Sequence, residues 1–112
     1  MEIEFRTKKL QKECNDSALL KRKHGEQRAK LIRRRLDEMR AARNLDVLRT
    51  LPGPRCHELV GDRKGQLSVD LDHTYRLIFA VNQSPVPEHA SRGLDRAQVT
   101  QIIVIQIADT HK

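Results

Sequence analysis

The first residues of the chain alternate between polar and apolar positions, as they do in a half-buried strand. Between Glu2 and Arg6, the apolar residues Ile3 and Phe5 fall on every second position and would share one face. This pattern predicts a short N-terminal strand.

Helical spacing follows the strand. Thr7 is suited to cap a helix that begins at Lys8, Asn15-Asp16 is expected to interrupt that helix, and Gly25 is expected to end it. A second helix is predicted from about Glu26 to Arg43, because apolar residues recur there at intervals of three and four: Ala29, Ile32, Leu36 and Met39. The two helices would form a hairpin joined by a tight turn.

The second half of the chain has the pattern of a sheet. An irregular segment anchored by Leu45, Leu48 and Leu51 is expected to end at Pro52-Gly53-Pro54. Four strands are then predicted, at Cys56–Val60, Leu67–Leu71, Tyr75–Val81 and Val99–Ala108. Residues 82–98 are mostly polar and contain prolines, and they predict a long, mobile loop.

The predicted element order is β-α-α-β-β-β-β. It favours an α+β fold in which an N-terminal strand and a helical hairpin are followed by a mainly antiparallel sheet, with the helices on one side. With 112 residues, the chain is long enough for one domain and too short for two. Residues 1–112 are therefore expected to form a single domain.

Positive charge is concentrated in the predicted hairpin. The chain has 22 Lys and Arg against 15 Asp and Glu, and residues 6–43 hold 14 of the basic residues but 5 of the acidic ones. Such an excess suits a polyanionic surface or an acidic protein partner, and equally a solvated helical face that keeps the protein soluble. Composition alone leaves these interpretations open.

Several classes of protein receive no support from the sequence. Cys14 and Cys56 lack the spacing of a zinc site and are expected to be reduced thiols, so neither a metal nor a cofactor is predicted. No apolar run approaches the ~18 residues of a membrane span, and the N-terminus lacks the features of a signal peptide. A cytoplasmic protein is therefore expected. Nucleotide-binding, serine-hydrolase and zincin motifs are absent from the sequence.

Arg76 differs from its surroundings. It lies within Tyr75–Phe79, which otherwise has the composition of a buried strand, and a charged guanidinium there needs a partner. One interpretation is a rigidly placed arginine whose planar fork grips a phosphate. The other is an arginine on the exposed face of the sheet, paired with a carboxylate such as Asp70.

Arg63 and Lys64 lie between two glycines in a polar turn. Backbone N–H groups and positive charge in such a turn could cradle a phosphate. Charged turns bounded by glycine are also common on protein surfaces, so the pattern by itself is not specific.

Two of the five histidines stand near predicted strand ends. His57 lies at the start of one strand, and His111 follows the last one. Strands far apart in the chain can meet at one edge of an antiparallel sheet, where a histidine could take or give a proton during phosphodiester cleavage. The remaining histidines fall in predicted turns and are expected to be surface residues: His24, His73 and His89.

Three segments together resemble one family of proteins. The segment from His57 to Ser68 is similar to the His-x-Leu-Lys-Gly-Asp-Arg-x-Gly-x-x-Ser stretch of HigB-type toxins. Tyr75–Phe79 is similar to their Tyr/Trp-Arg-hydrophobic-x-Phe strand, and Asp109-Thr110-His111 is similar to their terminal Asp-Tyr-His. With the element order, these motifs resemble the RelE/ParE superfamily of bacterial type II toxins, on the HigB-like, plasmid-maintenance killer-protein branch, along nearly the whole chain.

The resemblance implies a metal-independent endoribonuclease that binds in the ribosomal A site, cleaves mRNA there and inhibits growth. It also implies neutralisation by a HigA-like helix-turn-helix antitoxin. In the implied reaction the 2′-hydroxyl attacks the adjacent phosphate. His57, Asp109 and His111 would lie at the site, one histidine assisting proton transfer and Asp109 orienting it, while Arg76 stabilises the phosphate. Contacts to RNA would come from Arg63, Lys64, Lys30, Arg33, Arg34 and Arg40.

Two residues depart from the family's pattern. Val60 stands where lysine is common, and Thr110 stands where tyrosine is common, which removes a cation and an aromatic face worth ~1–3 kcal/mol per stacked base. Lys64 could supply the missing charge from the neighbouring turn. Two alternatives therefore stay open: a non-enzymatic, ParE-like toxin that inhibits DNA gyrase, and a degenerate toxin that only binds antitoxin or RNA.

Overall fold

The computed structural model describes residues 1–91 and 93–110. Within this part of the chain, a five-stranded sheet has the order β1-β7-β4-β3-β2. The strands are β1 (Glu2–Phe5), β2 (His57–Glu58), β3 (Gln66–Asp70), β4 (Tyr75–Val81) and β7 (Gln101–Asp109). β1 runs parallel to β7, whereas the other neighbouring strands are antiparallel. The predicted α+β fold with a mainly antiparallel sheet is confirmed.

Helices connect β1 to β2. They are α1 (Lys8–Asn15), α2 (Ser17–His24), α3 (Glu26–Ala41) and α4 (Leu45–Thr50). The side chain of Thr7 caps α1 by accepting a hydrogen bond from the N–H of Leu10, and Asp16 caps α2 in the same way. The predicted interruption at Asn15-Asp16 is therefore the boundary between two helices. The expectation of an irregular segment after residue 44 is wrong, because Asn44 caps α4 there.

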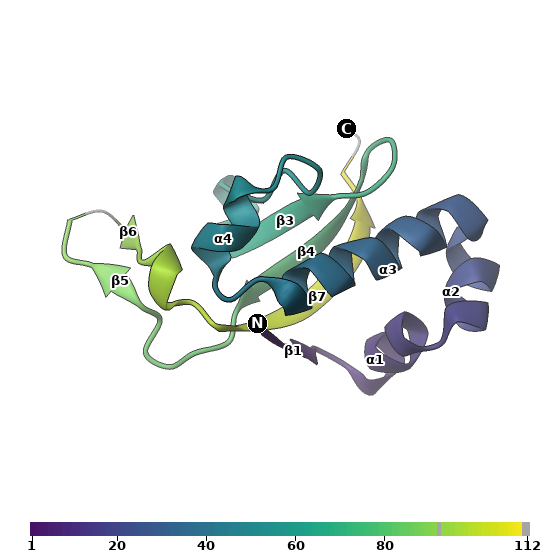
Figure 1. Cartoon of the computed structure of the whole chain (residues 1–112), viewed down its shortest axis with the longest axis horizontal. Helices are drawn as coiled ribbons and strands as arrows, with labels where there is room; N and C mark the ends of the chain where they lie inside the picture. The colour runs from purple at the N-terminus through teal and green to yellow at the C-terminus, as the bar shows by residue number, and fades with distance from the viewer. Residues whose placement is uncertain (92, 111–112) are drawn as a thin grey trace.

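The hydrophobic core lies between α3 and one face of the sheet. Figure 1 shows α3 running across β4 and β7. The apolar stripe of α3 packs in one cluster with alternate residues of the strands: Ala29, Ile32, Leu36 and Met39 with Leu67, Val69, Leu77, Phe79, Ile102 and Val104. Burial of each large aliphatic side chain contributes roughly 1.5–3 kcal/mol of stability. Because strand side chains alternate, the residues between these core positions point to the opposite face of the sheet.

Residues 82–98 have more structure than the expected mobile loop. β5 (Glu88–His89) and β6 (Gly93–Leu94) pair as a hairpin, and a 3₁₀ turn, Arg96–Gln98, follows. The side-chain oxygen of Gln83 accepts hydrogen bonds from the N–H groups of Thr100 and Gln101 at 2.7 and 3.1 Å. Arg96 also lies 3.5 Å from Glu58 in β2. The hairpin projects beyond one end of the sheet, as Figure 1 shows.

Among the described residues, none of the helices is both long and apolar enough to span a membrane.

Candidate functional site

The face of the sheet that points away from α3 carries a cluster of polar side chains, and we call it the open face. The strand register determines which residues share this face: Asp70 pairs with Arg76, Ser68 with Ile78, and Ile78 with Gln106. His57 of β2 pairs with Ser68 and therefore joins the same face. Three consecutive antiparallel pairings thus gather residues from four strands.

His57 and Arg76 contact each other directly on the open face. Nη1 of Arg76 lies 3.0 Å from Nε2 of His57, and Nδ1 of His57 lies 3.0 Å from the carbonyl oxygen of Arg55. A carbonyl can only accept, so Nδ1 carries the ring proton and Nε2 presents its lone pair to the arginine. The contacts therefore fix a neutral imidazole whose basic nitrogen faces a cation.

The backbone at Arg55 supports this orientation. Arg55 has φ of 47°, in the left-handed region that costs a non-glycine residue roughly 1–2 kcal/mol. Its carbonyl is the acceptor for Nδ1 of His57. Strained backbone of this kind is often found where a structure must hold a functional group in place.

Asp70 is the carboxylate partner that the sequence suggested for Arg76. Its Oδ1 lies 3.7 Å from Nε of Arg76, whose side chain is 32% exposed. The Arg76 guanidinium is therefore paired with a carboxylate, as one of the two interpretations expected, and its side chain still reaches solvent. Beside it, the buried oxygens Oγ of Ser68 and Oδ1 of Asp70 have no hydrogen-bond partner within the described protein. Unsatisfied polar atoms are uncommon in protein interiors.

Arg63 lies over the open face rather than in solvent. Its Nη1 donates to the side-chain oxygen of Gln66 in β3 at 3.0 Å, and its Nη2 donates to that of Gln106 in β7 at 3.1 Å. The guanidinium therefore bridges across β4. Positive φ angles of 67° and 92° at Gly61 and Gly65 allow the chain to turn at both ends of this segment. Both partners of Arg63 are neutral amides, so these hydrogen bonds do not neutralise its charge.

A cleft of about 640 Å³ joins these residues to the end of β7. Its lining includes Arg63, Arg76, Asp109 and Thr110, together with the turn from Leu59 to Asp62. Thr74 Oγ1 donates a hydrogen bond to Asp109 at 2.5 Å. The structure thus brings three of the predicted residues to the lining of one cleft, Arg63, Arg76 and Asp109, and His57 contacts Arg76 beside it. The predicted residue His111 lies outside the described residues.

The predicted RNA-binding residues of the helices lie elsewhere. Lys30, Arg33, Arg34 and Arg40 all belong to α3, which packs on the opposite side of the sheet from the open face. Lys64 is exposed and lines a neighbouring groove rather than the cleft itself. The predicted site residues therefore divide between two surfaces of the molecule.

Arg35 is an exception within the basic helix because it is buried. Its Nε donates to the backbone oxygen of Asp70 at 2.7 Å, and its Nη1 donates to Glu38 at 2.8 Å. The side chain is 9% exposed. Arg35 therefore ties α3 to the end of β3 where Asp70 meets Arg76, and it is unavailable to a partner.

Neither cysteine has the properties of a reactive thiol. Cys14 and Cys56 are both buried and unpaired by a disulfide. Burial raises the pKa of each thiol to about 12. Within residues 1–91 and 93–110, no group of three or more His, Cys, Asp or Glu side chains is arranged to hold a metal ion.

Sequence reasoning did not identify the residues that hold the site together. Gln66 and Gln106 fix Arg63, and Thr74 contacts Asp109. The alternation of β7 could have revealed Gln106, since a polar residue interrupts its run of isoleucines. No pattern in the sequence marks Thr74.

The element order, with an N-terminal strand, helices packed on one face and a mainly antiparallel sheet, is that of an α+β protein of the RelE-like class. A family model described as the RelE-like toxin of the type II toxin-antitoxin system HigB matches residues 3–89. The chain therefore belongs to the HigB-like toxin family and has the RelE-like fold. As a type II toxin, it has an antitoxin as its partner. A search of curated proteins found no match.

Proposed function

We propose that the chain is an mRNA-cleaving toxin that acts in the ribosomal A site, in the cytoplasm, without a metal ion or cofactor. The observation that carries the proposal is the 3.0 Å contact between the Arg76 guanidinium and the lone pair of His57 Nε2 on the open face. Its partners would be the ribosome and a HigA-like helix-turn-helix antitoxin. Residues 1–112 would act as a single toxin domain, since β7 lies beyond the matched residues 3–89 yet pairs with β1 and β4.

Binding of RNA would rearrange the His57–Arg76 pair. A phosphate attracts a guanidinium more strongly than a neutral imidazole does, because the phosphate is charged and accepts two parallel hydrogen bonds. Arg76 would turn toward the phosphate and uncover Nε2 of His57. The substrate would thereby activate the base that it needs.

The reaction would be an intramolecular transfer. His57 Nε2 takes the proton of the 2′-hydroxyl, and the 2′-oxygen forms a bond to the adjacent phosphorus. The bond from phosphorus to the 5′-oxygen breaks, which leaves a 2′,3′-cyclic phosphate and a 5′-hydroxyl. His111 is the candidate donor of the proton that the 5′-oxygen takes up. Asp109 would orient this histidine, and Arg76 would stabilise the charge on the phosphate.

Arg63 would act at longer range. Its guanidinium already spans β3 and β7, so it is rigid, and its neutral partners leave a positive charge beside the cleft. Fixed charges of this kind stabilise developing negative charge without reorganising. Arg63 would therefore support Arg76 rather than replace it.

The cations of α3 would serve docking rather than chemistry. Lys30, Arg33, Arg34 and Arg40 lie across the sheet from His57, so one RNA strand in the cleft does not reach them. A ribosomal A site surrounds its occupant with rRNA, whose phosphates could meet this second surface. Contacts of this type give affinity with little base specificity and depend on salt.

The attack by the 2′-hydroxyl can be tested on programmed ribosomes. An mRNA with a single 2′-deoxynucleotide at the mapped cleavage position is expected to resist cleavage at that position, while cleavage of the all-ribose mRNA continues in excess EDTA. Cleavage 3′ to the deoxynucleotide at an unchanged rate would contradict the proposed reaction.

A further inference from the structure

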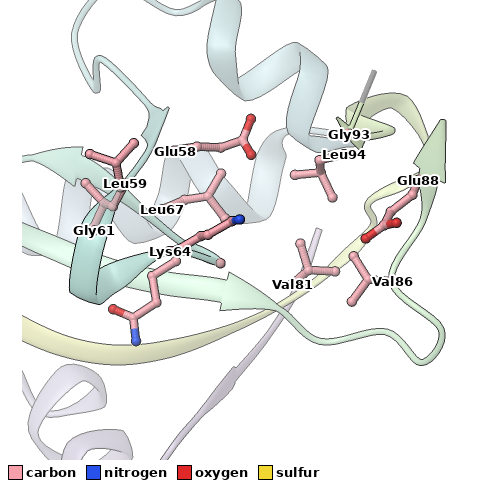
Figure 2. Close-up of a pocket in the computed structure, with 13 residues that line it drawn as sticks. Glu58, Leu59, Gly61, Lys64, Leu67, Val81, Val86, Glu88, Gly93 and Leu94 are labelled. Carbon is pink, nitrogen blue, oxygen red and sulfur yellow. The ribbon is translucent and has the colours of Figure 1, made fainter. Parts of the chain in front are cut away.

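A second hollow adjoins the cleavage cleft, between the sheet and the projecting hairpin. Figure 2 shows Leu67 and Lys64 on one side, Val81 and Val86 on another, and Leu94 of the hairpin above them. Its volume is about 820 Å³. That size is typical of sites for small groups, roughly 300–1,000 Å³, rather than of an extended protein interface. We call it the hairpin groove.

The hairpin groove adjoins the cleft that Arg76 lines. Leu59, Val60 and Gly61 line both hollows, so the turn that carries these residues forms a shared wall. Val60 is 86% exposed at this wall. A strand of RNA with its phosphate at Arg76 would therefore extend a neighbouring nucleoside along Val60.

The lining of the groove suits a base and not a phosphate. Its walls are aliphatic, and Figure 2 shows the carboxylates of Glu58 and Glu88 at the edges of the hollow. Among the described residues that line the groove, these two carboxylates outnumber the one cation, Lys64, so the lining favours hydrogen bonds from amino groups over a phosphate. Glu58 is 3.5 Å from Arg96, whereas Glu88 has no ion-pair partner in the described part of the chain.

We propose that the hairpin groove binds one unpaired nucleobase that carries an exocyclic amino group: adenine, cytosine or guanine. This inference rests on the proposed function, because it places the base beside the phosphate held by Arg76. The aliphatic walls cover the faces of the base, and the carboxylate of Glu88 accepts a hydrogen bond from its amino group. Uracil has no such group and binds less tightly.

Direct binding can be measured without cleavage. The full chain, labelled with ¹³C in valine and leucine methyl groups, would be titrated with 2′-O-methyl trinucleotides of adenosine, cytidine or uridine, which have no free 2′-hydroxyl. We expect the adenosine and cytidine oligomers to shift the methyl signals of Val60, Val81, Val86 and Leu94. We expect them to bind roughly fivefold tighter than the uridine oligomer, as one charge-assisted hydrogen bond allows.

Two variants distinguish recognition of the base from binding of the phosphate. Glu88→Gln is expected to reduce the binding preference for the adenosine over the uridine oligomer to less than about twofold. Asp37→Asn, on the exposed surface of α3, is the matched control and is expected to retain the preference of the wild type. Arg76→Ala is expected to weaken the binding of all three oligomers, while the ratio of their affinities stays the same. An unchanged ratio in Glu88→Gln, or shifts confined to other methyl groups, would overturn the inference.

The two proposals fail in different ways. If the base preference is found but ribosome-bound mRNA is not cleaved, the groove is a base subsite and the nuclease proposal is wrong. If mRNA is cleaved but none of the trinucleotides shifts the groove methyls, the base subsite is wrong, and the exposed Val60 and Val86 would instead mark a contact with a protein partner.

Discussion

Arg76 reaches across β3 to place its guanidinium 3.0 Å from the imidazole of His57, a residue 19 positions earlier in the chain. The two side chains share one face but are not direct cross-strand partners, because His57 pairs with Ser68 and Arg76 pairs with Asp70. The contact is therefore diagonal, and its geometry depends on the register of three strands. A shift of β3 by one residue would turn Ser68 and Asp70 to the other face and separate the pair.

Arg76→Ala is expected to reduce cleavage of ribosome-bound mRNA at least about 100-fold, since it removes a preorganised donor to the phosphate. Arg76→Lys keeps the charge but loses the planar fork, so we expect an intermediate rate. Single-turnover cleavage would give both rates. Because Arg76 is partly exposed, the free energy of unfolding should change by less than about 1 kcal/mol. Arg49→Ala, an exposed arginine on α4, is the control, and equal rates for Arg76→Ala and Arg49→Ala would remove Arg76 from the site.

Val60→Lys is expected to strengthen binding to RNA. Val60 is exposed and lines the cleft, so a lysine there adds a cation beside the phosphate without disturbing the core. The slope of log affinity against log salt for single-stranded RNA should become steeper by about 0.7, which corresponds to one further phosphate contact. Val47→Lys, an exposed valine on α4, is the matched substitution away from the cleft. Identical slopes for the two variants would show that Val60 does not face the RNA.

Glu13 is expected to make the packing of α1 on α2 depend on pH. Burial acts to raise the pKa of Glu13, but hydrogen bonds from His24 and Lys23 outweigh it, so the pKa lies below the ordinary value of 4.5. The unfolded chain therefore binds a proton more readily at this position than the folded chain does. The stabilisation is present above the ordinary pKa and is lost as the pH falls through the lowered pKa.

Urea denaturation of the wild type and Glu13→Gln would measure this dependence. The difference in free energy of unfolding should shrink as the pH falls from about 6 to about 3. Glu26→Gln is the matched control, since Glu26 is 74% exposed and lies 3.9 Å from its partner Lys21. A difference that stays constant over this range would contradict the role of the Glu13 carboxylate.

Cys14 and Cys56 are expected to resist thiol reagents in the folded protein. Burial raises the pKa of both to about 12, so almost none of either thiol is ionised near neutral pH. A disulfide reagent at pH 8 should titrate both thiols at once after denaturation in urea and neither before. Rapid modification of the native protein at either cysteine would contradict the packing of α1 or of the segment before β2.

The elements with strong periodicity could be predicted from the sequence. The stripe of α3 and the strand Tyr75–Val81 appear as expected, because each buries an apolar face whose spacing only one secondary structure can produce. α4 could not be predicted, since its six residues are too few for a helical period to show and its formation depends on the cap at Asn44. The hairpin of β5 and β6 could not be predicted either, because each of its strands has only two residues and the segment around it is held by contacts between distant residues, such as that of Gln83 with Thr100.

The candidate site was predicted in composition but not in arrangement. The sequence motifs pointed to His57, Arg63, Arg76 and Asp109 as candidate site residues. The contact between Arg76 and His57 depends on how β3 pairs with its two neighbouring strands, and no local pattern in the sequence specifies that pairing. The sequence also predicted RNA contacts from the cations of α3, together with Arg63 and Lys64 of the polar turn. The structure separates them, because the same helix that carries this charge must bury its other side against the sheet.

Cleavage in the A site can be measured by mapping the 5′ ends of mRNA on programmed ribosomes after addition of the purified protein. We predict cleavage within the A-site codon, none of naked mRNA, and a rate reduced at least about 100-fold in His57→Ala, which lacks the proposed base. His73→Ala, in the exposed turn before β4, should retain the wild-type rate. Absence of A-site cleavage by a protein that still arrests growth, or an undiminished rate in His57→Ala, would contradict the account and favour a toxin that acts by binding alone.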